Sequence, residues 1–402
     1  MDENSFDYNA SKTENNNIKI IKDTPKKCNI KYNKKIIIFS ILIIILISFL
    51  ISRILKLKNK IKYNNLHPKT NSWVITGGLI SYLFNERKQS NKERLFIYKE
   101  DTTPINNIKE EINIAMALDE KFIYPTLVSM ASALENNNKE KHIIIYHLLL
   151  SFDFNTTLID IFESLKQKYE VKINYYIFPN FFSLFRTWIG DTFTIYYKLF
   201  IPMIFNDYER ILFIDSDSLV FKDIYEMYNL PFNDNYIIGY ISHDAKFIDK
   251  FLKNVNIYIN GGVLLFNIKK IRSENKDFEL IQYNFENNEN LAFMEQDAIN
   301  IIFFQKIGIF PLKYGIYMYD ISVFDERFDN KRIRIKLNRN ELINAINDPS
   351  LVHFSCCTPK VWYNNSINYF GRNYICEKYH NLFYYYANKT DYYSEIYKKY
   401  IT

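Results

Sequence analysis

Short β-rich runs alternate with helix-like segments from residue 112 onward, and this alternation constrains the fold more than any other feature. The strand-like runs cover residues 114–118, 142–150, 171–178, 210–214, 236–241 and 262–266. Helix-like segments include residues 126–134, 157–168 and 197–205, and Pro125 suits the first turn of its helix. Such alternation predicts an α/β fold with a mostly parallel sheet covered by helices on both faces. Ligands bind such sheets at the carboxyl ends of strands.

The region before this domain contains one long apolar run. Residues 36–52 carry no charge, and lysines flank them on both sides. A membrane span takes about 20 residues, with a lower limit near 17, so we predict a transmembrane helix over residues 35–55 that contacts membrane lipid through residues 36–52. Residues 1–34 are polar and rich in Asn and Lys, which is typical of a disordered tail. We interpret residues 56–110 as a stem and residues 111–402 as the catalytic domain.

The charge of the chain is unevenly distributed. Of the 51 Lys+Arg and 45 Asp+Glu residues, 14 and 5 lie in residues 1–72, which leaves 37 basic against 40 acidic residues for the remainder. The excess positive charge therefore belongs to the segment around the predicted span. A nucleic-acid-binding face is not expected on the rest of the chain.

An acidic pair follows the most hydrophobic strand-like run, in the sequence FIDSDSLVF. Asp215 and Asp217 are two residues apart, so in extended backbone both side chains leave the same face, and Ser216 points the other way. Two neighbouring carboxylates repel each other unless a cation joins them, and their oxygens suit Mg²⁺ or Mn²⁺. A phosphatase-like nucleophile loop is the rival interpretation, but Leu219 stands where that loop has Thr or Val.

The order of motifs along the chain is similar to that of glycosyltransferase family 8, which includes glycogenins, lipopolysaccharide glycosyltransferases and glucoside xylosyltransferases. The resemblance covers about residues 112–370. Its blocks are ALDEKFIYP, YYKLFIPMIF, RILFIDSDSLVF, INGGVLLFNIKKIR, EQDAINIIF, PLKYG and HFSCCTPKVW. It implies a GT-A fold, a UDP-sugar donor, Mn²⁺ with Mg²⁺ as the alternative, and transfer with retention of anomeric configuration.

The resemblance assigns a metal site and a donor site. Asp215, Asp217 and His353 match the metal ligands, and an imidazole beside two carboxylates fits Mn²⁺ better than Mg²⁺. Positions expected to bind the donor are Asp119, Phe122, Lys198, Asp215, Ser216, Asn260, Gly261 and Lys360. Phe122 stands where the family has a Tyr that stacks on uracil, and Lys198 stands in place of an Arg.

Residues 295–297 match the family's catalytic D-Q-D block, with Glu295 in place of its first Asp. Gln296 and Asp297 match the other two positions. We expect a front-face mechanism because the neutral Gln296 is a poor nucleophile. The carboxylates of Glu295, Asp297 and Asp244 leave open a route through a covalent glycosyl-enzyme.

Several alternatives remain at this stage. One is a catalytically silent binding or scaffold protein with the same fold, and another is a glycogenin-like enzyme that glucosylates itself. A zinc site could use His353, Cys356, Cys357, Cys376 and His380, although adjacent cysteines suit a tetrahedron poorly. Alternatively, Cys376 could pair with Cys356 or Cys357 in a disulfide if the domain is lumenal.

Resemblance to single-pass enzymes of the secretory pathway predicts the localisation. We expect a type II membrane protein of the Golgi or endoplasmic reticulum with a lumenal catalytic domain. Its acceptor would be a hydroxyl of a glycan, glycoprotein or glycolipid. Lysines on both sides of the span leave the orientation open by charge alone.

Overall fold

A computed structural model describes residues 97–104, 109–178, 185, 187, 192–242, 257–317, 339–355, 360–364 and 373–401. The chain divides into two units, Met1–Lys69 and Thr70–Thr402, and all described residues belong to the second. The predicted span at residues 36–52 and Asp244 lie outside the described residues. Among the described residues no helix is both long and apolar enough to cross a membrane.

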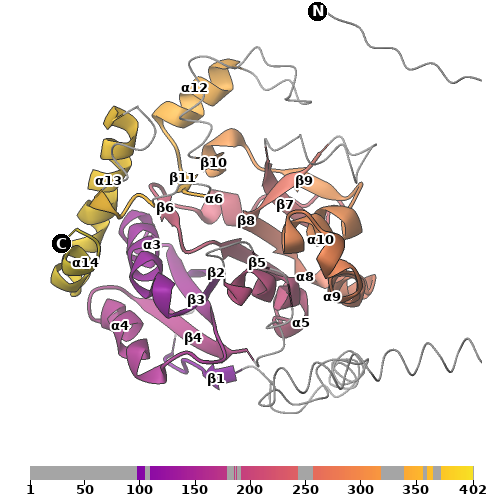
Figure 1. Ribbon diagram of the computed structural model, residues 1–402, viewed down its shortest axis with the longest axis horizontal. Helices are drawn as coiled ribbons and strands as arrows, with labels where there is room; N and C mark the ends of the chain where they lie inside the picture. The colour runs from indigo at the N-terminus through magenta and orange to yellow at the C-terminus, as the bar shows by residue number, and fades with distance from the viewer. Residues whose placement is uncertain are drawn as a thin grey trace, which may run out of the picture. The chain divides into compact units, whose positions relative to one another are not determined.

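A mixed eight-stranded sheet forms the centre of the described domain (Figure 1). Its strands are β1 (Ile97–Lys99), β2 (Glu110–Leu118), β3 (His142–Leu150), β4 (Val171–Ile177), β5 (Arg210–Ile214), β7 (Ile237–Ile241), β8 (Ile259–Asn267) and β9 (Ile307–Ile309). They lie in the order β1-β4-β3-β2-β5-β8-β7-β9. The neighbours from β4 to β5 are parallel, as are β7 and β9, whereas β8 is antiparallel to both β5 and β7 and β1 is antiparallel to β4.

The expectation of a mostly parallel sheet holds for six of the eight strands, which run in one direction, whereas β1 and β8 run the opposite way. The parallel pairing is continuous for β4-β3-β2-β5, where helix-like segments separate the strands in sequence. The helix-like segments that we identified from the sequence end at residue 205. After that point no helix was predicted between the strand-like runs, and consecutive strands that have no helix between them can pair antiparallel. Directly beside the acidic pair, β8 runs against both of its neighbours, β5 and β7.

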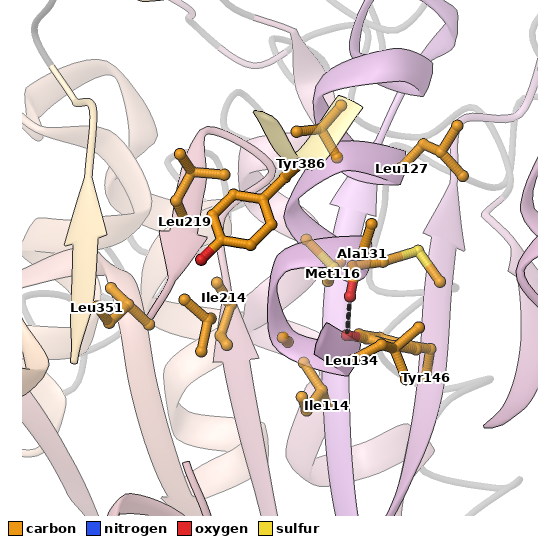
Figure 2. Packing of buried hydrophobic residues seen from close by; sticks show 14 of the residues in the cluster. Ile114, Met116, Leu127, Ala131, Leu134, Tyr146, Ile214, Leu219, Leu351 and Tyr386 are labelled. Carbon is orange, nitrogen blue, oxygen red and sulfur yellow. Dashed lines mark hydrogen bonds between the residues drawn. The ribbon is translucent and has the colours of Figure 1, made fainter. Parts of the chain in front are cut away.

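Helices cover both faces of the sheet, which explains why its strands are hydrophobic without alternation. On one face lie α3 (Ile123–Asn136), α13 (Asn373–Ala387) and α14 (Tyr393–Tyr400), and on the other lie η5 (Phe193–Phe200), α5 (Ile201–Ile204), α8 (Ile268–Ser273), α9 (Lys276–Asn287) and α10 (Met294–Ile302) (Figure 1). Ile114 of β2 packs in the core under α3, while Ala115 packs in the core under η5. Figure 2 shows the first core, where Leu127 and Leu134 of α3 face the sheet.

The predicted helix-like segments differ in how regular they are. Residues 126–134 lie within α3, as predicted. Residues 157–168 break into η3 (Thr156–Leu158), α4 (Ile159–Glu163) and η4 (Ser164–Gln167). Residues 197–205 comprise the end of the 3₁₀ helix η5 and the whole of the short α5, and Pro202 lies in the first turn of α5.

A second, three-stranded sheet carries part of the site. It contains β10 (Ile316–Tyr317), β11 (Leu351–His353) and β6 (Ser218–Val220), with β11 in the middle. The remaining short elements are η2 (Glu120–Phe122), α6 (Tyr225–Tyr228), η6 (Asn288–Asn290), η7 (Leu312–Tyr314) and α12 (Arg339–Asn347). Because β6 begins directly after Asp217, this sheet connects the acidic pair to the distant residue His353.

Candidate active site

The acidic pair and His353 meet because β6 pairs with β11. Ser218 of β6 is the register partner of His353, and the Phe354 N–H donates to the Asp217 carbonyl at 2.8 Å. On the other side, the Asp215 N–H donates to the Gly262 carbonyl of β8 at 2.7 Å. Backbone pairing on both sides of the acidic pair therefore fixes its position.

Asp215, Asp217 and His353 present one ligand atom each within 4.8 Å of one another. His353 Nε2 lies 3.1 Å from Asp217 Oδ1 and 3.5 Å from Asp215 Oδ2. Ligands that bind one ion at about 2.1 Å and at right angles lie about 3 Å apart, so these spacings fit one octahedral cation. The donor set of two carboxylates and an imidazole suits Mn²⁺.

The electrostatics of the pair are asymmetric. Burial alone would raise the pKa of Asp217, but neighbouring positive charge, chiefly that of Lys360, outweighs it and holds the pKa below its ordinary value. Lys360 Nζ lies 2.7 Å from Asp217 Oδ2. Burial raises the pKa of Asp215, with Asp217 adding to that rise and Lys198 opposing it. The Asp215 side chain is 31% exposed while that of His353 is 2% exposed, so the cluster is open toward solvent on the Asp215 side.

Gly262 makes room for the His353 ring. A Cβ at position 262 would lie 2.0 Å from His353 Cε1, closer than real Cβ contacts allow. A Cβ on the neighbouring Gly261 would meet its nearest atoms at 3.5 Å, which is ordinary contact. The close approach of backbone and ring thus requires glycine at position 262 and not at 261.

Lys198 is buried in an ion pair. Its Nζ donates to the Gly261 carbonyl at 2.9 Å and to Glu295 Oε1 at 3.2 Å, and it lies 3.6 Å from Asp215 Oδ1. Burial raises the pKa of Glu295 to about 7, with Lys198 opposing the rise. Lys198 therefore links the acidic pair to the predicted catalytic block.

Gln296 and Asp297 are held in one hydrogen-bonded network with β8. Gln296 Oε1 accepts from the Gly261 N–H at 2.8 Å, and its Nε2 donates to the Tyr258 hydroxyl at 3.1 Å. Tyr258 in turn donates to Asp297 Oδ1 at 2.5 Å. Asn300, one turn further along α10, hydrogen-bonds both the N–H and the carbonyl of Ile259 at 2.8 Å. The predicted catalytic block is thereby fixed against the strand that also carries Gly262.

Comparison with known proteins assigns this arrangement to a family. The model of glycosyl transferase family 8 matches residues 113–366, which is more than half of the chain. The chain belongs to glycosyl transferase family 8.

Curated relatives of this family 8 chain are glycosyltransferases. The chain is 26% identical over 306 residues to the lipopolysaccharide 1,2-glucosyltransferase of Escherichia coli, an alignment that covers 72% of this chain and 86% of that one. It is 25% identical over 223 residues to the lipopolysaccharide 1,3-galactosyltransferase of Salmonella typhimurium, covering 51% and 64% of the two chains. The family and these relatives establish the chain as a glycosyltransferase.

Solved structures confirm the GT-A fold. The bifunctional glycosyltransferase WbbM superimposes with a TM-score of 0.58 at 20% identity, covering 74% of this chain and 53% of WbbM. The galactosyltransferase LgtC, solved with donor and acceptor sugar analogues, gives a TM-score of 0.55 at 17% identity, covering 70% of this chain and 96% of LgtC.

The other residues that the sequence assigned to the donor site lie at the same sheet edge. Asp119 follows β2, which is parallel to and paired with β5, and its Oδ1 accepts from the Lys121 N–H at 2.9 Å. Phe122 is half-buried and meets Trp362 edge-on, with ring centroids 6.2 Å apart. The Ser216 hydroxyl is buried and donates to the Ala117 carbonyl at 3.3 Å, so its side chain points into the fold. Their contacts to a nucleotide stay predictions.

Three site residues escaped the sequence analysis: Tyr240, Tyr258 and Asn300. All three are buried, and of the two tyrosines Tyr240 lies in the predicted strand-like run 236–241, whereas Tyr258 directly precedes the family block that begins at Ile259. One signal was available for Asn300, because it follows Gln296 by four residues and so shares its helix face. The zinc alternative cannot be followed further, since the side chains of Cys356, Cys357 and Cys376 lie outside the described residues.

Proposed function

We propose that this chain is a metal-dependent, retaining glycosyltransferase that moves a hexose or pentose from a UDP-sugar to a hydroxyl of a glycan, glycoprotein or glycolipid. One observation carries the proposal: Asp215, Asp217 and His353 converge at the carboxyl end of β5 with ligand-like spacing. This is the sheet edge where α/β folds bind nucleotides.

Asp215, Asp217 and His353 would hold the divalent cation, which we propose to be Mn²⁺. When bound, the cation supplies Lewis-acid stabilisation of the charge that develops on the departing diphosphate. Asp217 suits this role because its pKa is held below the ordinary value, so the carboxylate stays ionised across the physiological pH range.

Lys360 and Lys198 have different roles in this proposal. Lys360 is 24% exposed and its ammonium lies beside Asp217, so it can reach a diphosphate oxygen next to the cation. Lys198 is 3% exposed, and its ammonium donates hydrogen bonds to the Gly261 carbonyl and to Glu295. We therefore assign the phosphate-contacting charge to Lys360, and to Lys198 the positioning of Glu295.

For the transfer step we propose the front-face route. The bond between the anomeric carbon and the diphosphate oxygen breaks, the acceptor oxygen bonds that carbon on the same face, and the acceptor proton passes to the leaving oxygen. Both carboxylate oxygens of Asp297 already accept hydrogen bonds, from Tyr258 and the Phe293 N–H, and Glu295 pairs with Lys198. These contacts weaken both side chains as nucleophiles. The neutral Gln296, fixed by Gly261 and Tyr258, would orient the donor sugar.

The proposal is tested by a donor screen with the purified full-length chain. Hydrolysis of UDP-glucose, UDP-galactose and UDP-xylose to UDP is measured with Mn²⁺, with Mg²⁺ and with a chelator. We expect one UDP-sugar to be hydrolysed faster than the others, with Mn²⁺ the more effective ion. Binding of UDP-sugars without hydrolysis or transfer would instead support the catalytically silent alternative, and growth in intact mass with UDP-glucose would support self-glucosylation.

We also propose that residues 36–52 anchor the enzyme as a type II protein of the Golgi or endoplasmic reticulum. The support is the uncharged length of this run and the lysines that flank it. The full-length chain should stay in the membrane pellet after an alkaline carbonate wash. Release of the full-length chain by that wash would contradict the anchor.

A further inference from the structure

Tyr240 is buried on β7 between His353 and Asn260. It is 3% exposed, and its hydroxyl oxygen lies 2.5 Å from His353 Nδ1 and 2.6 Å from Asn260 Oδ1. His353 Nδ1 is on the opposite side of the imidazole ring from the nitrogen that faces the acidic pair. The hydroxyl is therefore in a position to determine which ring nitrogen carries a proton.

The direction of these hydrogen bonds follows from the backbone N–H of Gly262, which can only donate. It donates to Asn260 Oδ1 at 2.7 Å. This contact identifies the oxygen end of the Asn260 amide, which can only accept. Tyr240 must therefore donate its single hydroxyl hydrogen to Asn260 Oδ1. Its oxygen then faces His353 Nδ1 with a lone pair, and Nδ1 must carry the proton.

We propose that Tyr240 is a positioning residue of the metal site, which holds His353 in the tautomer protonated at Nδ1 and so presents the Nε2 lone pair to the cation. The inference rests on the proposed metal-dependent function. With Nδ1 protonated, a neutral ring has a lone pair on Nε2, 3.1 Å from Asp217 Oδ1 and 3.5 Å from Asp215 Oδ2. Three electron-rich atoms then converge, and a cation among them removes their repulsion.

The rings of Tyr240 and His353 each pack closely against a glycine. A Cβ at Gly315 would lie 2.4 Å from the Tyr240 Cβ, and a Cβ at Gly262 would lie 2.0 Å from His353 Cε1. Each ring thus lies against a glycine where any larger residue would displace it. The rings meet at 74° with centroids 6.1 Å apart. The hydroxyl and the imidazole are held in register by backbone from β8 and from the segment before β10.

The decisive variant is Tyr240→Phe in the full-length chain, because it keeps the ring and removes only the hydroxyl. Mn²⁺ affinity is measured by electron paramagnetic resonance of free Mn²⁺. We expect affinity to fall about 10- to 100-fold, the usual effect of losing an outer-sphere partner of a ligating histidine. Tyr146→Phe is the matched control, since Tyr146 is 1% exposed on β3 and donates to the Met130 carbonyl at 3.2 Å. Its Mn²⁺ affinity should equal that of the wild type.

The tautomer is read directly from the metal-free chain. The chain has six histidines, so ¹⁵N-labelling of histidine gives few signals, and the His353 signal is assigned by its absence in His353→Ala. We expect the neutral His353 ring to carry its proton on Nδ1 in the wild type, and the Nε2–H tautomer to appear in the neutral ring of Tyr240→Phe. A bare Nδ1 in the neutral wild-type ring would overturn the assignment.

The experiments distinguish a failure of the role assigned to Tyr240 from a failure of the proposed metal-dependent function. Equal Mn²⁺ affinity in the wild type and Tyr240→Phe would overturn the role of Tyr240 and leave the metal-dependent function standing. Wild-type chain that binds no Mn²⁺, and whose UDP-sugar hydrolysis is indifferent to a chelator, would overturn the proposed function itself.

Discussion

At the scale of single residues, the Lys198–Glu295 pair joins two departures from the family pattern. The resemblance places an Arg at position 198 and an Asp at position 295. The sequence analysis treated these changes separately, but the structure shows the two side chains 3.2 Å apart. The two departures are therefore in direct contact, and the sequence alone did not indicate this contact.

Glu295 provides a prediction about pH. Its pKa is raised by burial from the ordinary 4.5 to about 7, so the folded chain keeps this proton at pH values where the unfolded chain has released it. The contribution of Glu295 to stability is therefore greatest below pH 4.5 and falls as the pH rises to about 7. The loss is on the order of 3 kcal/mol.

This loss is measured by comparing urea unfolding of the metal-free wild type and Glu295→Gln at about pH 5 and about pH 8. The variant lacks the titrating group, so its stability relative to the wild type should increase toward the higher pH. Parallel stability curves for the two proteins would contradict the raised pKa.

At the scale of elements, β8 and β11 support each other through Gly262. Gly262→Ala places a Cβ within the His353 ring, so we expect Mn²⁺ affinity to fall at least about 10-fold and stability to fall by about 1–3 kcal/mol from overpacking. Gly261→Ala is the matched neighbour, because its Cβ finds ordinary contacts at 3.5 Å. Calorimetric Mn²⁺ titration should separate the two variants, and equal losses of affinity in both would contradict the packing described for β8.

Helix α10 is attached to β8 by Asn300. This side chain is fully buried and hydrogen-bonds the N–H and carbonyl of Ile259 as well as the Gln296 carbonyl. Asn300→Ala leaves buried backbone groups without partners at about 1–3 kcal/mol each, so we expect a loss of about 2–5 kcal/mol in the free energy of unfolding.

Asn287→Ala serves as the comparison for this helix attachment. Asn287 donates a single hydrogen bond, to the Tyr283 carbonyl of its own helix, at 3.0 Å. Its removal should cost less than about 1.5 kcal/mol in the same urea experiment. A cost for Asn300→Ala no larger than that would show that this side chain does not secure α10.

At the scale of the whole molecule, the sequence predicted the fold where local patterns carry the information. The runs at 142–150 and 210–214 coincide with β3 and β5, because strands buried on both faces are hydrophobic throughout. Direction is a non-local property, so the antiparallel β8 was not predicted. Two members of the candidate metal cluster followed from the Asp215–Asp217 spacing. His353 required the family resemblance, since it lies 136 residues after Asp217 in the chain.

The outer parts of the site could not be predicted at all. The strand-like run 236–241 indicates that Tyr240 is buried, and Tyr258 lies outside every predicted run. In neither case does the pattern say which groups the hydroxyl meets. Those partners come from β8, α10 and β11, three elements that are distant in sequence and meet only in the folded chain. Polar residues within hydrophobic strands are thus the positions where the sequence was least informative.

The central claim is that Asp215, Asp217 and His353 together hold a divalent cation that glycosyl transfer requires. Its most direct test is Mn²⁺ affinity and UDP-sugar hydrolysis in Asp217→Asn, compared with Asp234→Asn, whose side chain is 71% exposed and pairs with Lys270. We predict that Asp217→Asn stays folded, binds Mn²⁺ at least about 10-fold more weakly and loses hydrolysis, while Asp234→Asn matches the wild type. Wild-type Mn²⁺ affinity and hydrolysis in folded Asp217→Asn would contradict the account.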